Sequence, residues 1–180
     1  MAELISSRYA GALFEVSLEI KKEEETYNEL AAISEVFRSN IDFFKVMKTP
    51  TVSKEEKKNI LISVFESKVS SEVFNFMKIL VDKGRFGSFL DICEAFKGLL
   101  NSHKNIMEVI AVTAVELTAQ QKSNLEEKLS KSTGKTIELK NEIDTSVLGG
   151  VLIRMGNEEI DGTVKSRLDK LKEEISQIIA

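Results

Sequence analysis

The residue types that most often carry chemistry are few in this chain and far apart. The one histidine, His103, and the one cysteine, Cys93, have no second ligand of either type. Neither zinc binding nor thiol–imidazole catalysis is therefore expected. Cys93 is expected to be a small core residue, and His103, beside Lys104 at a helix end, to be solvated. A phosphoacceptor role for His103 fits less well, because such a histidine should lie in mid-helix on an exposed face.

Two adjacent glycines, Gly149 and Gly150, could suggest a phosphate-binding loop. Their spacing matches neither common glycine-rich phosphate-binding pattern, and no P-loop lysine follows. We interpret them as a place where two backbone segments approach too closely for a side chain. The charge runs at residues 23–25 and 54–58 are interpreted as solvated helix faces. The sequence therefore predicts no active site, no cofactor and no metal site.

Composition limits the class of protein. The chain has 180 residues, of which 42% are hydrophobic and 30% charged, as in ordinary globular proteins. Residues 1–105 carry 15 basic and 16 acidic residues, so no basic half exists to follow a nucleic-acid backbone. No apolar run approaches the roughly 20 residues that cross a bilayer, and the N-terminus does not resemble a signal peptide. Neither direct membrane insertion nor nucleic-acid binding is expected.

Helical signals occupy residues 1–105, which we expect to form a six-helix antiparallel bundle. A capping box at Ser53 and Glu56 predicts the start of the fourth helix. Pro50 and Gly84 predict the ends of the third and fifth. The expected helices cover residues 3–22, 26–38, 42–48, a segment after Ser53, 71–83 and 87–102.

The hydrophobic period changes near Asn105, where residues 106–115 become rich in valine and isoleucine. A second capping box at Thr118 and Gln121 opens a helix that should close at Gly134. Strands are expected at residues 106–115, 137–143 and 147–155, and a last helix from about Gly162. The sequence thus predicts an α+β protein with a helical domain at 1–105 and a strand-helix-strand-strand-helix domain at 106–180.

Three segments carry a family resemblance. They are Arg-Tyr-Ala-Gly-Ala-Leu-Phe at residues 8–14, Asp-Lys-Gly-Arg-Phe at 82–86, and the segment 148–171 that begins Leu-Gly-Gly-Val-Leu-Ile-Arg-Met-Gly. In this order they resemble the delta subunit of bacterial F-type ATP synthases, the family of the mitochondrial oligomycin-sensitivity-conferring protein. The resemblance implies a non-catalytic stator subunit without a cofactor. It would be a monomer within the complex, at the cytoplasmic face of the membrane, coupling ion flow to ATP synthesis.

The resemblance also implies a surface for the catalytic head. Members of the family hold the N-terminal helix of an alpha subunit with their first and fifth helices. Here these helices carry more apolar faces than one bundle core uses, which suits helix-in-groove recognition. The pattern alone equally allows both helices to be enclosed by their neighbours. The residues assigned to this surface are Tyr9, Ala10, Ala12, Leu13, Phe14, Phe76, Ile79, Leu80 and Lys83.

A second implied surface binds the b subunits of the peripheral stalk. The residues assigned to it are Gly149, Gly150, Arg154, Asp161, Gly162, Leu168 and Leu171. Arg154 and Asp161 are expected to order the turn and cap the last helix. Val164, Leu168, Leu171, Ile175 and Ile178 have the spacing of a coiled-coil seam, which either packs on the three-strand sheet or faces the stalk.

A different class of protein, a helical RNA-binding or antitermination-type module, stays open as an alternative, since small helical bundles also serve there. The acidic balance of the helical half weighs against it. RNA affinity that falls steeply with added salt would support it.

Overall fold

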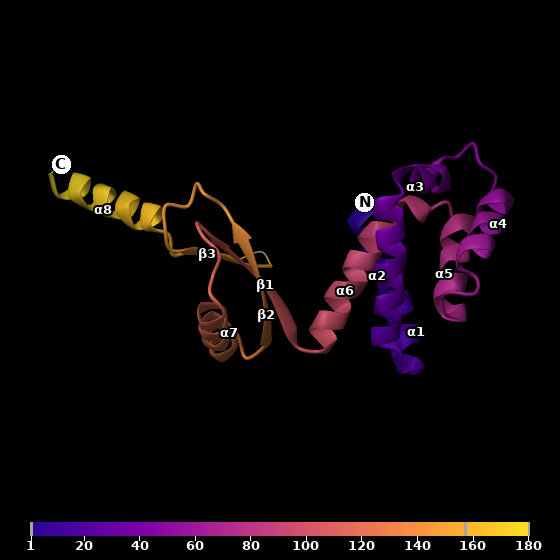
Figure 1. Cartoon of the computed structure of the whole chain (residues 1–180), viewed down its shortest axis with the longest axis horizontal. Coiled ribbons are helices and arrows are strands. Elements are labelled where there is room, and N and C mark those ends of the chain that lie inside the picture. The colour runs from indigo at the N-terminus through magenta and orange to yellow at the C-terminus, as the bar shows by residue number, and fades with distance from the viewer. Residues whose placement is uncertain (1, 157, 180) are drawn as a thin grey trace. The chain divides into compact units, whose positions relative to one another are not determined.

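The chain folds into two compact units, Met1–His103 and Lys104–Ala180. The computed structural model describes residues 2–156 and 158–179, with side-chain surroundings over residues 4–156 and 158–172. The first unit is helical and the second combines helices with a sheet (Figure 1). The α+β class predicted from the sequence is therefore confirmed.

The first unit is built around aromatic side chains. The ring of Phe37 lies between 5.2 and 5.9 Å, centroid to centroid, from the rings of five other phenylalanines. Within the unit α1 lies along α6, α6 also packs on α2, and α4 packs on α5. The elements are α1 (Ala2–Glu19), α2 (Glu23–Ser39), α3 (Ile41–Lys48), α4 (Lys54–Phe65), α5 (Ser71–Asp82), the 3-10 turn η1 (Phe86–Ser88) and α6 (Phe89–His103).

Local signals place the ends of α4 and α5. Ser53 Oγ accepts from the Glu56 backbone N–H at 3.2 Å, and Glu56 Oε2 accepts from the Ser53 N–H at 3.0 Å. This confirms the predicted capping box. Gly84 follows α5 with φ +65°, and the Arg85 N–H donates to the Leu80 carbonyl at 2.8 Å. The predicted glycine stop is confirmed as well.

The second unit contains a four-stranded mixed sheet in the order β2-β1-β3-β4. β1 is parallel to β2 and antiparallel to β3, and β3 is antiparallel to β4. Val109, Leu129 and Ile153 are buried between the sheet and α7. The elements are β1 (Ile106–Thr113), α7 (Ala119–Thr133), β2 (Thr136–Ile143), β3 (Val151–Met155), β4 (Glu158–Asp161) and α8 (Val164–Ile179).

The prediction of a three-stranded sheet was wrong, because the sheet has a fourth strand, β4. β4 has four residues, all of them exposed, so it lacks the apolar alternation that marks a half-buried strand. β3 also begins at Val151 and not at Val147, because the Val147 N–H closes a turn onto the Asp144 carbonyl at 3.1 Å.

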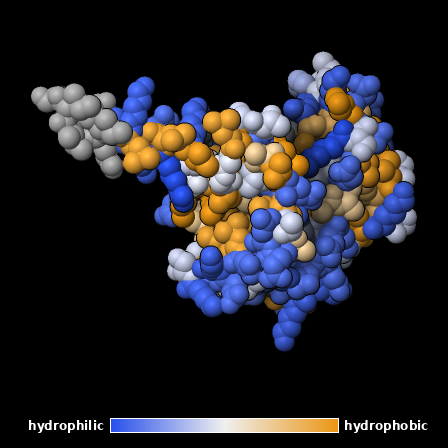
Figure 2. Space-filling view, turned by 60° about the vertical axis from the view of Figure 1, so that its left-hand side comes forward, coloured by the Kyte–Doolittle hydropathy of each residue, from blue (hydrophilic) through white to orange (hydrophobic). Residues whose placement is uncertain are grey.

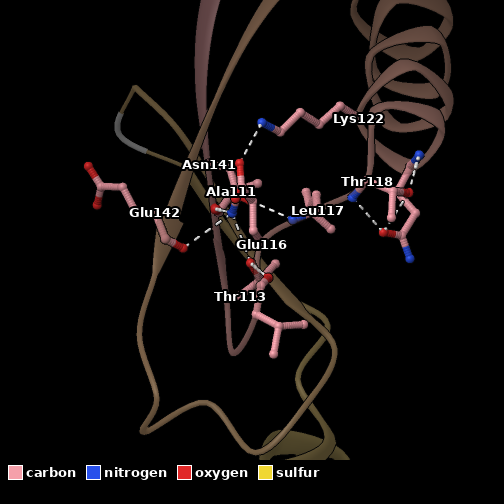
Figure 3. A network of polar contacts seen from close by, with 10 residues as sticks. Ala111, Thr113, Glu116, Leu117, Thr118, Lys122, Asn141 and Glu142 are labelled. Atoms are coloured by element: carbon pink, nitrogen blue, oxygen red, sulfur yellow. Dashed lines mark hydrogen bonds and ion pairs between the residues drawn. The ribbon is translucent and has the colours of Figure 1, made fainter.

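One polar side chain organises the connection between β1 and α7 (Figure 3). Asn141, on β2, donates from Nδ2 to the Ala111 carbonyl at 2.9 Å and to Thr113 Oγ1 at 2.8 Å. Its Oδ1 accepts from the Leu117 N–H at 2.8 Å. Leu117 precedes Thr118, whose predicted capping box with Gln121 is present. Asn141 therefore fixes the backbone from which α7 starts.

Candidate functional site

An apolar strip on α1 and α5 remains open to solvent in the first unit. We define the α1–α5 face as Tyr9, Ala12, Val16, Phe76 and Ile79, of which Phe76 is buried. Tyr9, Ala12 and Val16 share one side of α1 by helical spacing, and Ile79 lies one turn beyond Phe76 on α5. The rings of Tyr9 and Phe76 meet edge to face with centroids 6.4 Å apart. Ala12 is exposed, and Val16 and Ile79 are 42% and 47% exposed.

The structure divides the nine residues assigned to the alpha-subunit surface into two groups. Ala10, Leu13, Phe14, Phe76 and Leu80 are buried within the unit, where they position α1 and α5. Tyr9 is half-buried, whereas Ala12, Ile79 and Lys83 are exposed.

The enclosed-helix alternative is therefore wrong for Ile79, although it holds for the buried group. The assigned set did not include Val16 on α1 or Ile20 directly after it, although both are exposed apolar residues that continue the helical spacing of Tyr9.

In the second unit, the start of α8 lies directly against the start of β3. A Cβ atom on Gly150 would lie 2.4 Å from the Gly162 carbonyl oxygen and 2.9 Å from Thr163 Cα. Gly150 also has φ +83°, which favours glycine. The Val164 N–H donates to the Gly149 carbonyl at 2.9 Å. The predicted close approach of two backbone segments is confirmed at Gly150.

The polar residues near the contact between α8 and β3 have roles that differ from the prediction. Thr163 is the N-cap of α8, because its Oγ1 accepts from the Ser166 N–H at 3.2 Å. Asp161 Oδ1 instead accepts from the Thr163 N–H at 2.8 Å. This bond lowers the pKa of the Asp161 carboxyl. Arg154 Nε donates to Glu159 Oε2 at 3.0 Å, which ties β3 to β4.

Hydrophobic side chains lie along the described first part of α8 (Figure 2). We define the α8 row as Val164, Leu168 and Leu171, which are spaced four and three residues apart. All three are exposed, Leu168 to 55%. The described part of the sheet therefore does not enclose these three side chains. The side chains of Ile175 and Ile178 lie outside the described part of the helix.

The groups that could carry chemistry are inert or already engaged. Burial raises the pKa of the Cys93 thiol to about 12, so the thiol is neutral at pH 7 and a poor nucleophile. The exposed ring of His103 packs edge to face on Phe14 with centroids 5.9 Å apart. Over the described residues, no group of three or more histidine, cysteine, aspartate or glutamate side chains could hold a metal ion. No helix in that part of the chain is long and apolar enough to cross a membrane.

A further cleft, of about 360 Å³, lies between α2 and the α4–α5 connection and was not expected from the sequence. Ala32, Val36 and Phe65 contribute to its walls. Its one carboxylate, on Glu29, accepts from the backbone N–H of Ser70 at 2.9 Å and from Ser70 Oγ at 2.7 Å. The carboxylate thus supports the start of α5, and the cleft offers mainly apolar contacts.

Comparison with known proteins decides the family. The model of the ATP synthase delta (OSCP) subunit family matches residues 5–175. The chain belongs to this family. As a delta subunit it is a structural and not a catalytic part of F-type ATP synthase, and the RNA-binding alternative falls away.

Individual relatives match over the whole chain. The ATP synthase subunit delta of Alkaliphilus metalliredigens is 44% identical over 179 residues, which are 99% of each chain. That of Clostridioides difficile is 42% identical over 181 residues, covering all of both chains. A chain in the cryo-EM structure of the Toxoplasma gondii mitochondrial ATP synthase hexamer has a TM-score of 0.73 at 23% identity, over 97% of each chain. That chain shares the fold.

Proposed function

We propose that this chain connects the peripheral stalk to the top of the catalytic head at the cytoplasmic face of the membrane. It would hold the head against the torque of the rotor, so that ion flow drives ATP synthesis. One observation carries the proposal beyond family membership. Each unit presents an exposed apolar surface of its own, the α1–α5 face on the first and the α8 row on the second. A connector needs one such surface for each partner.

On the head side, the partner is the N-terminal helix of an alpha subunit, lying along the α1–α5 face. An amphipathic helix offers apolar anchors every three or four residues, and the exposed side chains of Val16 and Ile79 would receive such anchors. The Tyr9–Phe76 contact sets the spacing of the two receiving helices. Because the unit's own core already holds these helices, little conformational entropy is lost on binding.

On the stalk side, the α8 row packs against the ends of the b subunit helices. Its spacing of four and three residues suits coiled-coil-like contacts. The hydrogen bond from Val164 to Gly149 and the close contact at Gly150 join α8 to the sheet. A pull on α8 is thereby passed to β3 through backbone contacts.

Replacement of Ile79 by aspartate in the full chain tests the head side. The variant should fold, since Ile79 is already 47% exposed and its remaining burial contributes about 1 kcal/mol. Titration with an alpha-subunit N-terminal peptide should show binding weakened by about 100-fold, because an unpaired carboxylate must be desolvated in an apolar interface.

Ile62→Asp is the matched control. Ile62 lies on α4, outside the α1–α5 face, and is 39% exposed. It should lose similar stability and keep peptide affinity. Equal affinity for the peptide in both variants would contradict the assignment of the α1–α5 face.

Leu168→Asp tests the stalk side. We expect loss of binding to the b subunits with alpha-peptide affinity retained, because Leu168 is 55% exposed and belongs to the second unit. Unchanged binding to b would contradict the role of the α8 row.

The division of labour also requires units that fold separately. A fragment of residues 1–105 should be soluble and helical, with a cooperative melt by circular dichroism. A disordered spectrum would show that the predicted domain division is wrong.

A further inference from the structure

A buried lysine stands out at the corner where α3, α4 and α5 meet. Lys57 was predicted to lie on a solvated face, and that prediction is wrong, since the residue is only 9% exposed. Its Nζ donates to the Thr49 carbonyl at 2.7 Å. An ammonium has three donors, and over the described residues this one makes a single hydrogen bond and no ion pair. Buried charges are normally paired.

Lys57 lines a cleft of about 110 Å³. The cleft is far below the ~300 Å³ at which pockets for small organic ligands begin, so it suits one small group. Lys48 lies beside it, with Cε 3.5 Å from the position that a Cβ atom on Gly87 would take. Lys48 Nζ lies 5.2 Å from the centroid of the Phe44 ring. Gly84 and Gly87 form part of the wall.

The charges around this corner are mostly positive. No carboxylate belongs to the described lining of the cleft, and that of Asp82, on α5, is engaged by Lys58 at 2.6 Å. Lys54 Nζ donates to the Asp82 carbonyl oxygen at 2.8 Å. Lys83 and Arg85 flank Gly84 and are both exposed. Two further carboxylates come from the 54–58 run. That of Glu56 is held in the capping box, and Glu55 is exposed.

We propose that this cleft binds one small oxyanion, a carboxylate or a phosphate group, through the Lys57 ammonium. The remaining donors of this ammonium would form charge-assisted hydrogen bonds with the oxyanion. An acidic side chain of a neighbouring subunit and inorganic phosphate both offer this chemistry. The site is separate from the α1–α5 face, because Val81, which lines the cleft, points to the opposite side of α5 from Ile79.

Amide NMR of the full chain tests the site. Sodium acetate and sodium phosphate are added separately and compared with sodium chloride at equal ionic strength. Acetate, phosphate or both should give saturable shifts of the Gly84 and Gly87 amides, and chloride should not. Lys57→Met keeps the aliphatic stem without the charge and should weaken the response at least tenfold. The matched control is Lys58→Met, which removes the ion pair with Asp82 and should retain the response of the amide shifts to the anion.

Each outcome has a defined meaning. Saturation by acetate alone indicates an acidic side chain as the natural ligand, and saturation by phosphate alone indicates a phosphate group. Saturation by both leaves a general oxyanion site. Absence of saturation in the wild-type chain refutes the proposal, even if Lys57→Met fails to fold because Thr49 loses its donor. An unchanged response in a folded Lys57→Met variant also refutes it. Alpha-peptide affinity should be the same in Lys57→Met and wild type, so the outcome is independent of the head-side proposal.

Discussion

Gly150 is the position where one added methyl group should do most damage to the second unit. In Gly150→Ala the new Cβ would lie 2.4 Å from the Gly162 carbonyl oxygen and 2.9 Å from Thr163 Cα. Both contacts are to backbone, so no side-chain rotation relieves them. The residue must also hold φ +83°, a conformation that alanine disfavours.

The expected cost follows from these two effects. Left-handed backbone conformation costs a non-glycine residue about 1–2 kcal/mol, and overpacking costs about 1–3 kcal/mol. The joint between β3 and α8 should therefore lose about 2–5 kcal/mol. Since 1.4 kcal/mol is a factor of ten, its local opening should increase roughly 30-fold or more.

Hydrogen exchange of the full chain measures that opening directly. Amides of β3 and the first turn of α8 should exchange faster in Gly150→Ala, with the first unit unchanged. Gly156→Ala is the control for backbone conformation alone, because Gly156 has φ +57° and no atom within 4 Å of an added Cβ. Gly98→Ala, at an open position in α6, should stabilise the first unit by about 0.5–1 kcal/mol. Exchange in Gly150→Ala no faster than in Gly156→Ala would refute the steric argument.

Three further residues give testable outcomes. Asn141→Leu removes the side chain that donates to Ala111 and Thr113 and accepts from the Leu117 N–H. Because these groups lose a hydrogen-bond partner, the second unit should lose about 2–4 kcal/mol of stability, measured by urea unfolding; a loss below 0.5 kcal/mol, roughly the value of an inert surface change, would argue against its role. Because the pKa of Cys93 is raised to about 12, its thiol should resist alkylation in the folded chain at pH 8. Stability should fall as pH rises from about 9 towards 12, where the unfolded thiol ionises first; a Cys93→Ala variant should lack this slope. The pKa of Asp161 is lowered. Its hydrogen bond to the Thr163 N–H should therefore stabilise the start of α8 at neutral pH, and this stabilisation should disappear as pH falls through and below the usual aspartate range. The chemical shift of the Thr163 amide should follow that titration and be pH-independent in Asp161→Asn.

Several features of this protein could be predicted from the sequence because they depend on neighbouring residues. The capping boxes at Ser53 and Thr118 and the glycine stops at Gly84 and Gly134 are complete within a few positions. Helix and strand periods mark the change near Asn105 for the same reason. The close backbone packing at Gly150 could also be predicted, because two adjacent glycines leave room for it.

Tertiary structure alone decided which side chains face a partner and which face the core. Leu80 and Ile79 are adjacent on α5, yet one is buried and the other half exposed, because the neighbouring helices cover only one side. Lys57 was read as solvated from its charged neighbours, but the packing of α3 and α5 over α4 encloses it. Asn141 binds residues 24 to 30 positions away along the chain. Burial and long-range pairing depend on segments that meet only after folding, and no local pattern specifies them.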